Sequence, residues 1–214
     1  MIPLRRTPLF LLLALLACRP EAGEPSAATV GRGTDRAPAP QWQSSPTSDV
    51  RLEGADPLRV QTGPHTLIFP ATGDSLAPPY TVSATLQKQQ GRLHEGYGLV
   101  FGGESLAADE PRQSYSYFLV RGDGTYLIKR RDGASTSVVR DWTHHAAVPR
   151  DTEEGGQPVT LAVHVAPAEV RFRVNGQQVA AIPTAELRTS GQVGLRVAHD
   201  VRLAVSAFRA APDR

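Results

Sequence analysis

The chain has 214 residues, which is enough for one domain of ordinary size or for two very small ones. Its formal net charge is +2, but Arg5 and Arg6 lie in a segment that we expect to be removed, and without them the 23 basic side chains are reduced to the number of the 21 acidic ones. A near-neutral surface gives no electrostatic basis for binding nucleic acid, so we expect no such partner. The single cysteine, Cys18, excludes an intrachain disulfide.

The first 17 residues have the layout of a secretory signal peptide. Two arginines precede a short apolar run over residues 9–16, and the small residue Ala17 follows this run. A transmembrane helix needs roughly 18 or more apolar residues, and this run is much shorter. We therefore expect residues 1–17 to be cleaved from the mature protein.

The next residue, Cys18, completes a second motif. Leu15-Leu16-Ala17-Cys18 resembles the lipobox of bacterial lipoproteins. This resemblance implies cleavage before Cys18 and acylation of its thiol, which would anchor the protein to a membrane with about 0.8 kcal/mol for each buried CH₂ group. Arg19 follows the cysteine, and by analogy with lipoprotein sorting in Gram-negative cells it favours the outer membrane of the cell envelope. The alternative is an ordinary signal peptide in which Cys18 is incidental.

The segment over residues 18–56 is rich in Pro, Ala, Gly, Ser and Thr and has no apolar periodicity. Such a segment buries too little apolar surface to offset the entropy of ordering it, so we expect a disordered tether. Trp42 is the exception in this composition, and it either docks on the domain or is exposed. We expect one domain over residues 57–214.

The expected domain shows the alternation of β-strands, with turn residues between the runs and no convincing helical period. The clearest runs are residues 80–88, 159–165, 193–197 and 201–208. In the first of them, one face consists of Tyr80, Val82, Ala84 and Leu86. About ten to twelve short strands with little or no helix predict an all-β protein made of two packed antiparallel sheets.

One hairpin is predicted around Asn175-Gly176. Both residues tolerate positive φ, so they favour a two-residue type I′ turn between alternating strands. The register then pairs Val174 with Gln177 and Phe172 with Val179. Phe172 faces the interior in this register, and Arg171 and Arg173 face outward.

A second hairpin is predicted around Gly122-Asp123-Gly124, with Arg121 paired to Thr125. One face of this hairpin consists of Phe118, Val120, Tyr126 and Ile128. The opposite face consists of Tyr115, Tyr117, Leu119, Arg121, Leu127 and Lys129. Both faces carry apolar groups, so one is the core, and the other is either partly covered or a binding surface.

Several short motifs occur in a characteristic order: Tyr97-Gly98-Leu99-Val100-Phe101, Tyr117-Phe118-Leu119-Val120 with Gly122-Asp123-Gly124-Thr125-Tyr126, Trp142, Val174-Asn175-Gly176, and Ser190-Gly191-Gln192-Val193-Gly194-Leu195. Together they resemble concanavalin A-like lectin and glucanase domains over roughly residues 75–210, in particular laminin-G-like and 3-keto-disaccharide hydrolase-type domains of bacterial secreted proteins. The resemblance implies a two-sheet antiparallel jelly-roll sandwich with a concave sheet, on which many relatives bind carbohydrate. It implies no particular activity, because this fold hosts lectins, glycosidases and inert modules.

No catalytic or metal-binding motif is found in the sequence. Retaining glucanases of this fold carry Glu-x-Asp-x-x-Glu on one strand, and that pattern is absent here. His144 and His145 are adjacent, so on a strand they point to opposite faces and do not share a metal. The remaining acidic candidates, expected to be solvated loop charges, are Glu104, Asp109, Glu110, Asp151, Glu153 and Glu154. We expect no metal and no cofactor.

The leading hypothesis is a membrane-anchored, non-catalytic module that binds a glycan. Aromatic rings can stack on sugar C–H faces, and arginines suit sugar hydroxyls or carboxylates. The candidate binding residues are Tyr115, Tyr117, Arg121, Lys129, Trp142, Arg171 and Arg173. In the competing interpretation the aromatic rings fill a core or cover a sheet edge, and the arginines are a soluble outer face. The alternative functions are a glycoside or keto-disaccharide hydrolase, and a structural or protein-binding envelope lipoprotein.

Overall fold

The computed structural model describes residues 40–213. The predictions for residues 1–39, among them the signal peptide and the acylation of Cys18, lie outside this range. The described part contains fourteen β-strands and two single-turn 3₁₀ helices, η1 (Glu110–Arg112) and η2 (Thr184–Glu186). No helix in this part is long and apolar enough to cross a bilayer.

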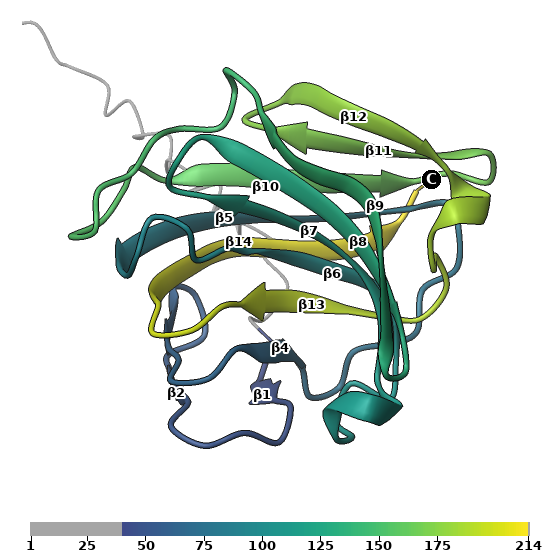
Figure 1. The fold of residues 1–214 in the computed structure, drawn as a ribbon. Helices are drawn as coiled ribbons and strands as arrows, with labels where there is room; N and C mark the ends of the chain where they lie inside the picture. Colours follow the sequence, from purple (N-terminus) through teal and green to yellow (C-terminus); the bar gives the residue numbers. More distant parts are fainter. Residues whose placement is uncertain (1–39, 214) are drawn as a thin grey trace, which may run out of the picture. The chain divides into compact units, whose positions relative to one another are not determined.

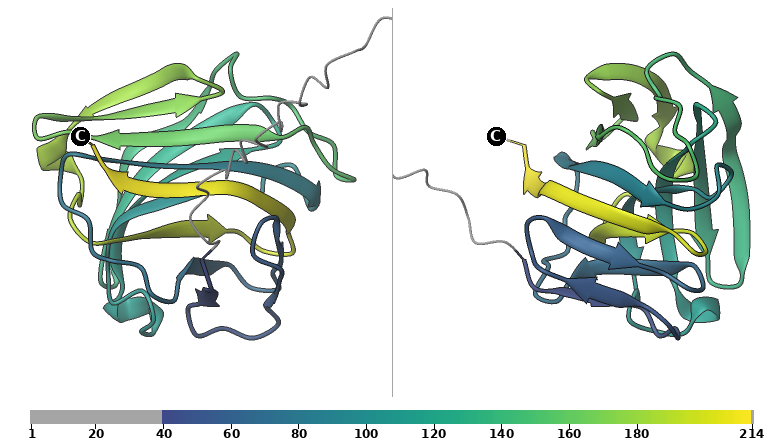
Figure 2. Two further views of the ribbon diagram at one scale, coloured as in Figure 1. Left: turned by 180° about the vertical axis from the view of Figure 1, so that it is seen from behind. Right: turned by 90° about the vertical axis from the view of Figure 1, so that its left-hand side faces the viewer.

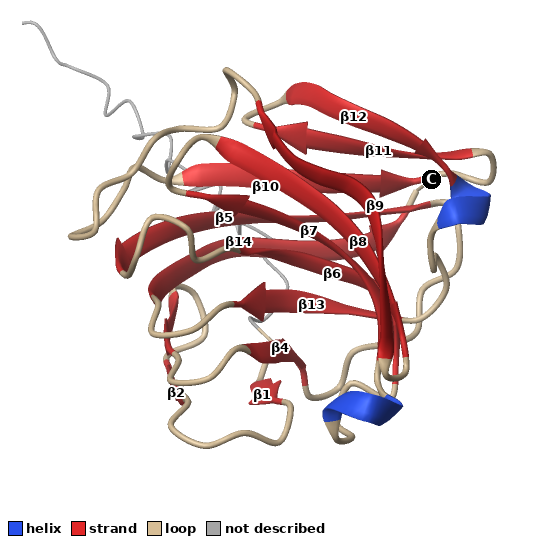
Figure 3. Cartoon of the chain, viewed as in Figure 1, coloured by secondary structure: helices blue, strands red, loops and turns tan. Residues whose placement is uncertain are grey.

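The strands form two seven-stranded sheets that lie face to face as two layers (Figures 1 and 2). Sheet A consists, in spatial order, of β1 (Trp42–Ser44), β4 (Thr66–Pro70), β13 (Gln192–Val197), β6 (Tyr97–Glu104), β7 (Ser114–Arg121), β8 (Thr125–Asp132) and β9 (Ser135–His144). Sheet B consists of β12 (Gln177–Pro183), β11 (Glu169–Val174), β10 (Val159–Val165), β5 (Tyr80–Gln90), β14 (Arg202–Pro212), β3 (Leu58–Gln61) and β2 (Arg51–Glu53). Neighbours far apart in sequence, such as β5 and β14, pair antiparallel, so the predicted two-sheet sandwich is confirmed (Figure 3).

The core between the sheets follows the alternation of the strands. In β5 the residues from Tyr80 to Leu86 that fall on the predicted face are buried, while the residues between them are partly exposed. Successive side chains of a strand point to opposite faces, so this pattern places one face of β5 against sheet A. Strand β6 differs, because every residue from Tyr97 to Gly103 is buried. The face of sheet A that turns away from sheet B must therefore also be covered near β6.

Both predicted hairpins are present, and one has a different register from the prediction. Strands β7 and β8 pair Arg121 with Thr125 and Phe118 with Ile128, as expected. Strands β11 and β12 pair Val174 with Gln177 around a turn in which Asn175 and Gly176 have φ of 49° and 82°. Further along, however, Phe172 pairs with Ala180 and not with Val179. A β-bulge between Phe172 and Arg173 shifts the register, and a strict two-residue alternation does not anticipate it.

The domain begins earlier than predicted. Strand β1 pairs with β4 and β2 pairs with β3, so Trp42–Ser44 and Arg51–Glu53, which lie in the expected tether, are strands of the two sheets. Trp42 docks on the domain: its ring meets Phe208 edge-on at 4.9 Å, and its Nε1 donates a hydrogen bond to the Ala55 carbonyl oxygen at 3.3 Å. These strands have three residues each, which is too short for an alternation pattern to be recognised among prolines.

Candidate functional site

The face of sheet A that points away from sheet B carries an apolar cluster of its own, separate from the core of the sandwich. We call it the outer cluster. Its buried members are Leu67, Phe69, Val100, Leu106, Tyr115, Tyr117, Leu119 and Leu127, and Trp142 packs against them while partly exposed. The face of the β7–β8 hairpin made of Phe118, Val120, Tyr126 and Ile128 lies in the core. The opposite face is therefore the covered outer one, which resolves the ambiguity of this hairpin.

Tyr115 and Tyr117 lie at the centre of the outer cluster and are almost fully buried, with exposed fractions of 1% and 6%. Their ring centroids are 5.5 Å apart. Burial raises the pKa of both hydroxyl groups, so both rings are neutral at physiological pH. Neither ring has a free face on which a sugar could stack. The competing interpretation, that these tyrosines fill a core, is the one that the structure supports.

Charged side chains lie over and around these two tyrosines. The Arg196 guanidinium lies 5.1 Å from the centre of the Tyr117 ring, a distance typical of a cation–π contact. Glu110, in η1, accepts a hydrogen bond from Arg131 Nη1 at 2.7 Å, and His65 Nε2 lies 3.4 Å from the same carboxylate oxygen. Burial and the nearby Arg196 lower the pKa of His65. Glu110 was expected from the sequence to be a solvated loop charge, and Arg131, Arg196 and His65 were not among the candidate residues.

A second aromatic–guanidinium pair lies on the same sheet. The Arg121 guanidinium is 4.2 Å from the centre of the Trp142 ring, and Asp123 holds it with contacts of 2.7 and 2.8 Å. Gly96 makes room for the ring, because a Cβ atom there would lie 2.9 Å from Trp142 Cη2. Burial disfavours the charged form of Asp123, but hydrogen bonds from Arg121 and Thr125 outweigh it and lower the pKa of this carboxyl group. Arg121 is thus a pre-oriented, partly exposed cation on an aromatic support.

The structure brings together only some of the residues that the sequence predicted as binding residues. Tyr115, Tyr117 and Arg121 lie on β7, Lys129 lies on β8 beside Tyr117, and Trp142 lies on β9, all in sheet A. Arg171 and Arg173 lie on β11 of sheet B, on either side of the core residue Phe172. Their side chains therefore face outward from the opposite side of the sandwich, and they cannot share a ligand with the outer cluster. Arg171 is already paired with Glu169 at 2.6 Å.

Of the acidic candidates, Asp151 does not fit its prediction. It was expected to be a solvated loop charge, but its side chain is 1% exposed and faces Lys88, with Oδ2 3.8 Å from Nζ. Tyr97 donates a hydrogen bond to the same carboxylate oxygen at 3.0 Å. Glu104 and Asp109 pair with Arg188 and Arg112 at the surface. No group of three or more His, Cys, Asp or Glu side chains within residues 40–213 is arranged to hold a metal ion.

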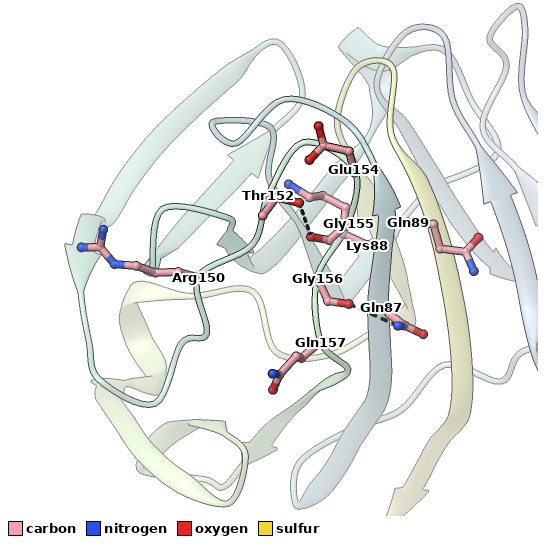
Figure 4. Close-up of a pocket in the computed structure, with 9 residues that line it drawn as sticks. All are labelled: Gln87, Lys88, Gln89, Arg150, Thr152, Glu154, Gly155, Gly156 and Gln157. Atoms are coloured by element: carbon pink, nitrogen blue, oxygen red, sulfur yellow. Dashed lines mark hydrogen bonds between the residues drawn. The ribbon is translucent and has the colours of Figure 1, made fainter.

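A pocket of about 600 Å³ lies next to this buried pair, between the end of β5 and residues 150–157 (Figure 4). Its polar side chains do not converge: Arg150 and Gln89 point to opposite sides, and Gln87 is engaged with the Gly156 carbonyl oxygen at 3.2 Å. The outer face of sheet A, with two guanidinium–aromatic pairs, is therefore the stronger candidate for a binding site.

No protein-family model matches the sequence, and no curated protein matches it. Several solved structures, however, resemble the structure of this chain. The carbohydrate-binding module CBM66 from Bacillus subtilis has a TM-score of 0.62 at 12% identity, over 80% of this chain and 96% of that module. A Bacillus subtilis protein of unknown function with a galectin-like fold has a TM-score of 0.59 at 10% identity, over 79% of this chain and 88% of that one. The exoplasmic/lumenal domain of VIP36, in its Ca²⁺- and Man3GlcNAc-bound form, has a TM-score of 0.56 at 9% identity, over 81% of this chain and 84% of that domain.

The fold is a galectin-like jelly roll. At this level the predicted concanavalin A-like sandwich is confirmed, because two antiparallel seven-stranded sheets superpose on such domains over most of the chain. The narrower resemblance to laminin-G-like and 3-keto-disaccharide hydrolase-type domains stays a prediction. Sequence identities of 9–12% are evidence for a shared fold and not for a shared function.

Proposed function

We propose that this domain is a non-catalytic glycan-binding module and that the outer face of sheet A is its binding surface. The observation that carries the proposal is the match to a carbohydrate-binding module over 96% of that module's length, combined with two guanidinium–aromatic pairs on one sheet. A second neighbour, VIP36, is a domain whose structure holds Man3GlcNAc. The fold alone would not support a function, and the chemistry of this face supplies the second support.

The chemistry of Arg121 and Trp142 suits a sugar. A guanidinium presents up to five donors in a fixed plane, and Asp123 uses only part of this set. The indole under Arg121 is partly exposed and adds apolar surface beside the guanidinium, which the C–H groups of a sugar can contact. Because both groups are held in place by neighbours, little entropy is lost when a ligand binds.

We further propose that the module is attached to the outer membrane through acylated Cys18. The support is the charged and apolar prelude followed by Leu15-Leu16-Ala17-Cys18.

The test is a glycan-array screen of the protein without its first 18 residues, with hits measured by calorimetry. We expect Trp142→Ala and Arg121→Ala to weaken binding at least tenfold, about 1.4 kcal/mol or more, while thermal melting confirms that the variants fold. Arg173→Ala, on the opposite side of the sandwich, is the matched control and should bind as the parent protein does. Binding that Arg173→Ala abolishes and Trp142→Ala leaves intact would move the site to sheet B. Failure to bind any glycan would reject the proposal, and release of sugar products would favour the hydrolase alternative.

A further inference from the structure

The charges around the buried tyrosines of sheet A do not balance. Arg131, Arg196 and His65 surround this part of the outer cluster, and Glu110 is the carboxylate that faces them. Glu110 is shared, at 2.7 Å from Arg131 Nη1 and 3.4 Å from His65 Nε2. Within residues 40–213, no acidic side chain pairs with Arg196. The carboxylate of Glu110 is therefore the single negative charge that faces two permanent cations, Arg131 and Arg196, and one histidine.

Arg196 is also poorly satisfied in its hydrogen bonds. Its Nε is buried and has no hydrogen-bond partner among the described residues, and its guanidinium rests on the Tyr117 ring. A buried donor without an acceptor is unfavourable, and an arginine with neither carboxylate nor carbonyl partner is unusual in a packed cluster. The residue as a whole is nevertheless partly exposed, as are His65 and Glu110 next to it. A ligand that brings an anion to the accessible part of the guanidinium would supply the carboxylate partner that Arg196 lacks within residues 40–213.

A carboxylate is the anion that fits this position best. The planar guanidinium fork matches a carboxylate with two parallel hydrogen bonds, and this pairing is stronger than a neutral contact when water is partly excluded. Tyr117 and its neighbours provide such a low-polarity surrounding under Arg196. The protein itself pairs a guanidinium with a carboxylate beside the same tyrosines, where Arg131 donates a hydrogen bond to Glu110.

Resting on the proposed glycan-binding function, we infer that the ligand is an acidic glycan and that Arg196 binds the carboxylate of a uronic acid residue. Arg196 is then the residue that selects charged over neutral sugars, while Arg121 and Trp142 contribute contacts that any sugar can use. Glu110 competes with the ligand, because it places a negative charge beside the position of the sugar carboxylate.

The experiment measures by calorimetry the binding of trigalacturonate and of its methyl ester to the full chain. The ester has nearly the same shape without the charge, so we expect it to bind at least tenfold more weakly. Arg196→Gln should cause a similar loss for trigalacturonate and little change for the ester. Arg196→Lys should restore only part of the affinity, because lysine keeps the charge and loses the planar fork. Arg173→Gln, an exposed arginine on sheet B, is the control and should bind normally.

Glu110→Gln gives a readout that misfolding cannot imitate. It removes the competing charge at a partly exposed side chain, so we expect trigalacturonate to bind severalfold more tightly. Equal binding of acid and ester, unaffected by Arg196→Gln, would overturn the inference and leave the glycan-binding function intact. Equal binding of a sulfated galactan would also overturn it, because any anion would then suffice. Absence of binding to every glycan would reject the proposed function itself.

Discussion

Lys88 and Asp151 face each other inside the domain, with Nζ 3.8 Å from Oδ2 and with both side chains at most 1% exposed. Neither Lys88 Nζ nor Asp151 Oδ1 has a hydrogen-bond partner within residues 40–213, so the two charges compensate each other chiefly by Coulomb attraction. The pair joins the end of β5 to the segment that follows β9, and the Asp151 backbone N–H donates to the Gly122 carbonyl oxygen at 2.9 Å. A contact between such distant parts of the chain holds this end of the sandwich closed.

Removing one member of this pair should be far worse than removing both. Lys88→Met leaves a buried, uncompensated carboxylate, and we expect it to lower the free energy of unfolding by about 3–5 kcal/mol. Asp151→Leu should cost a similar amount, and the double variant should cost clearly less than the sum. Urea unfolding of the parent protein, the two single variants and the double variant measures these changes in the free energy of unfolding. A loss below about 1 kcal/mol in both single variants would contradict a buried charge pair.

The Lys88–Asp151 pair also shows where sequence reasoning stops. The alternation from Tyr80 to Leu86, extended by two residues, places Lys88 on the core side of β5, so half of the pair could be inferred. Its partner could not, because Asp151 lies in an irregular segment whose path depends on the packing of the whole domain. A lysine at the end of an apolar face therefore predicts a buried partner without identifying it.

The candidate binding face of sheet A could also be predicted only in part from the sequence. The register of the β7–β8 hairpin correctly grouped Tyr115, Tyr117 and Lys129 on one face, because a short turn determines which residues pair. That this face is covered depends on Leu106 and Glu110, which the connection between β6 and β7 brings over it. Neither a turn nor an alternation pattern contains that information. In this domain the loop that crosses the sheet surface therefore determines that this face is covered.

Raising the pH should destabilise the protein above about pH 10, where a solvent-exposed tyrosine ionises. Burial raises the pKa of all five tyrosines, which are Tyr80, Tyr97, Tyr115, Tyr117 and Tyr126. The unfolded state loses these protons at a lower pH than the folded state does. The stability present below about pH 10 therefore decreases above it, by at most about 1.4 kcal/mol per pH unit for each tyrosine. Urea unfolding between about pH 8 and 11, followed by tyrosinate absorbance, tests this; tyrosines that ionise freely in the folded protein would contradict it.

The earlier start of the domain predicts that its first strand stabilises it. Trp42→Ala removes the edge-on contact with Phe208, and we expect a loss of about 2–3 kcal/mol, below the cost for a fully buried tryptophan. Gln43→Ala, in the same strand, is the control and should change stability by less than about 0.5 kcal/mol. A protein that begins at residue 57 should melt at a lower temperature than one that begins at residue 38. Equal melting temperatures would show that β1 and β2 contribute nothing.

Acylation of Cys18 predicts a modified N-terminus and a location at the membrane. In a bacterial host the mature protein should begin at Cys18, carry the mass of its acyl chains and sediment with the membranes, since two or more chains anchor a protein stably. Cys18→Ser should abolish both the added mass and the sedimentation. An unmodified cysteine in a soluble, cleaved protein would instead support an ordinary signal peptide.

Binding of an acidic glycan should become tighter as the pH falls below about 6.5, the ordinary pKa of histidine. Burial and Arg196 lower the pKa of His65, so this ring is neutral at pH 7. A carboxylate bound beside it would favour the protonated ring, so binding takes up a proton, and the affinity rises until the sugar carboxylates are themselves protonated at lower pH. His199, whose Nε2 lies 3.4 Å from His65 Nδ1, and Glu110 face the same ring. His65→Gln should therefore flatten the pH profile measured with trigalacturonate while preserving binding at pH 7, and a profile unchanged by this substitution would show that His65 is not linked to the ligand.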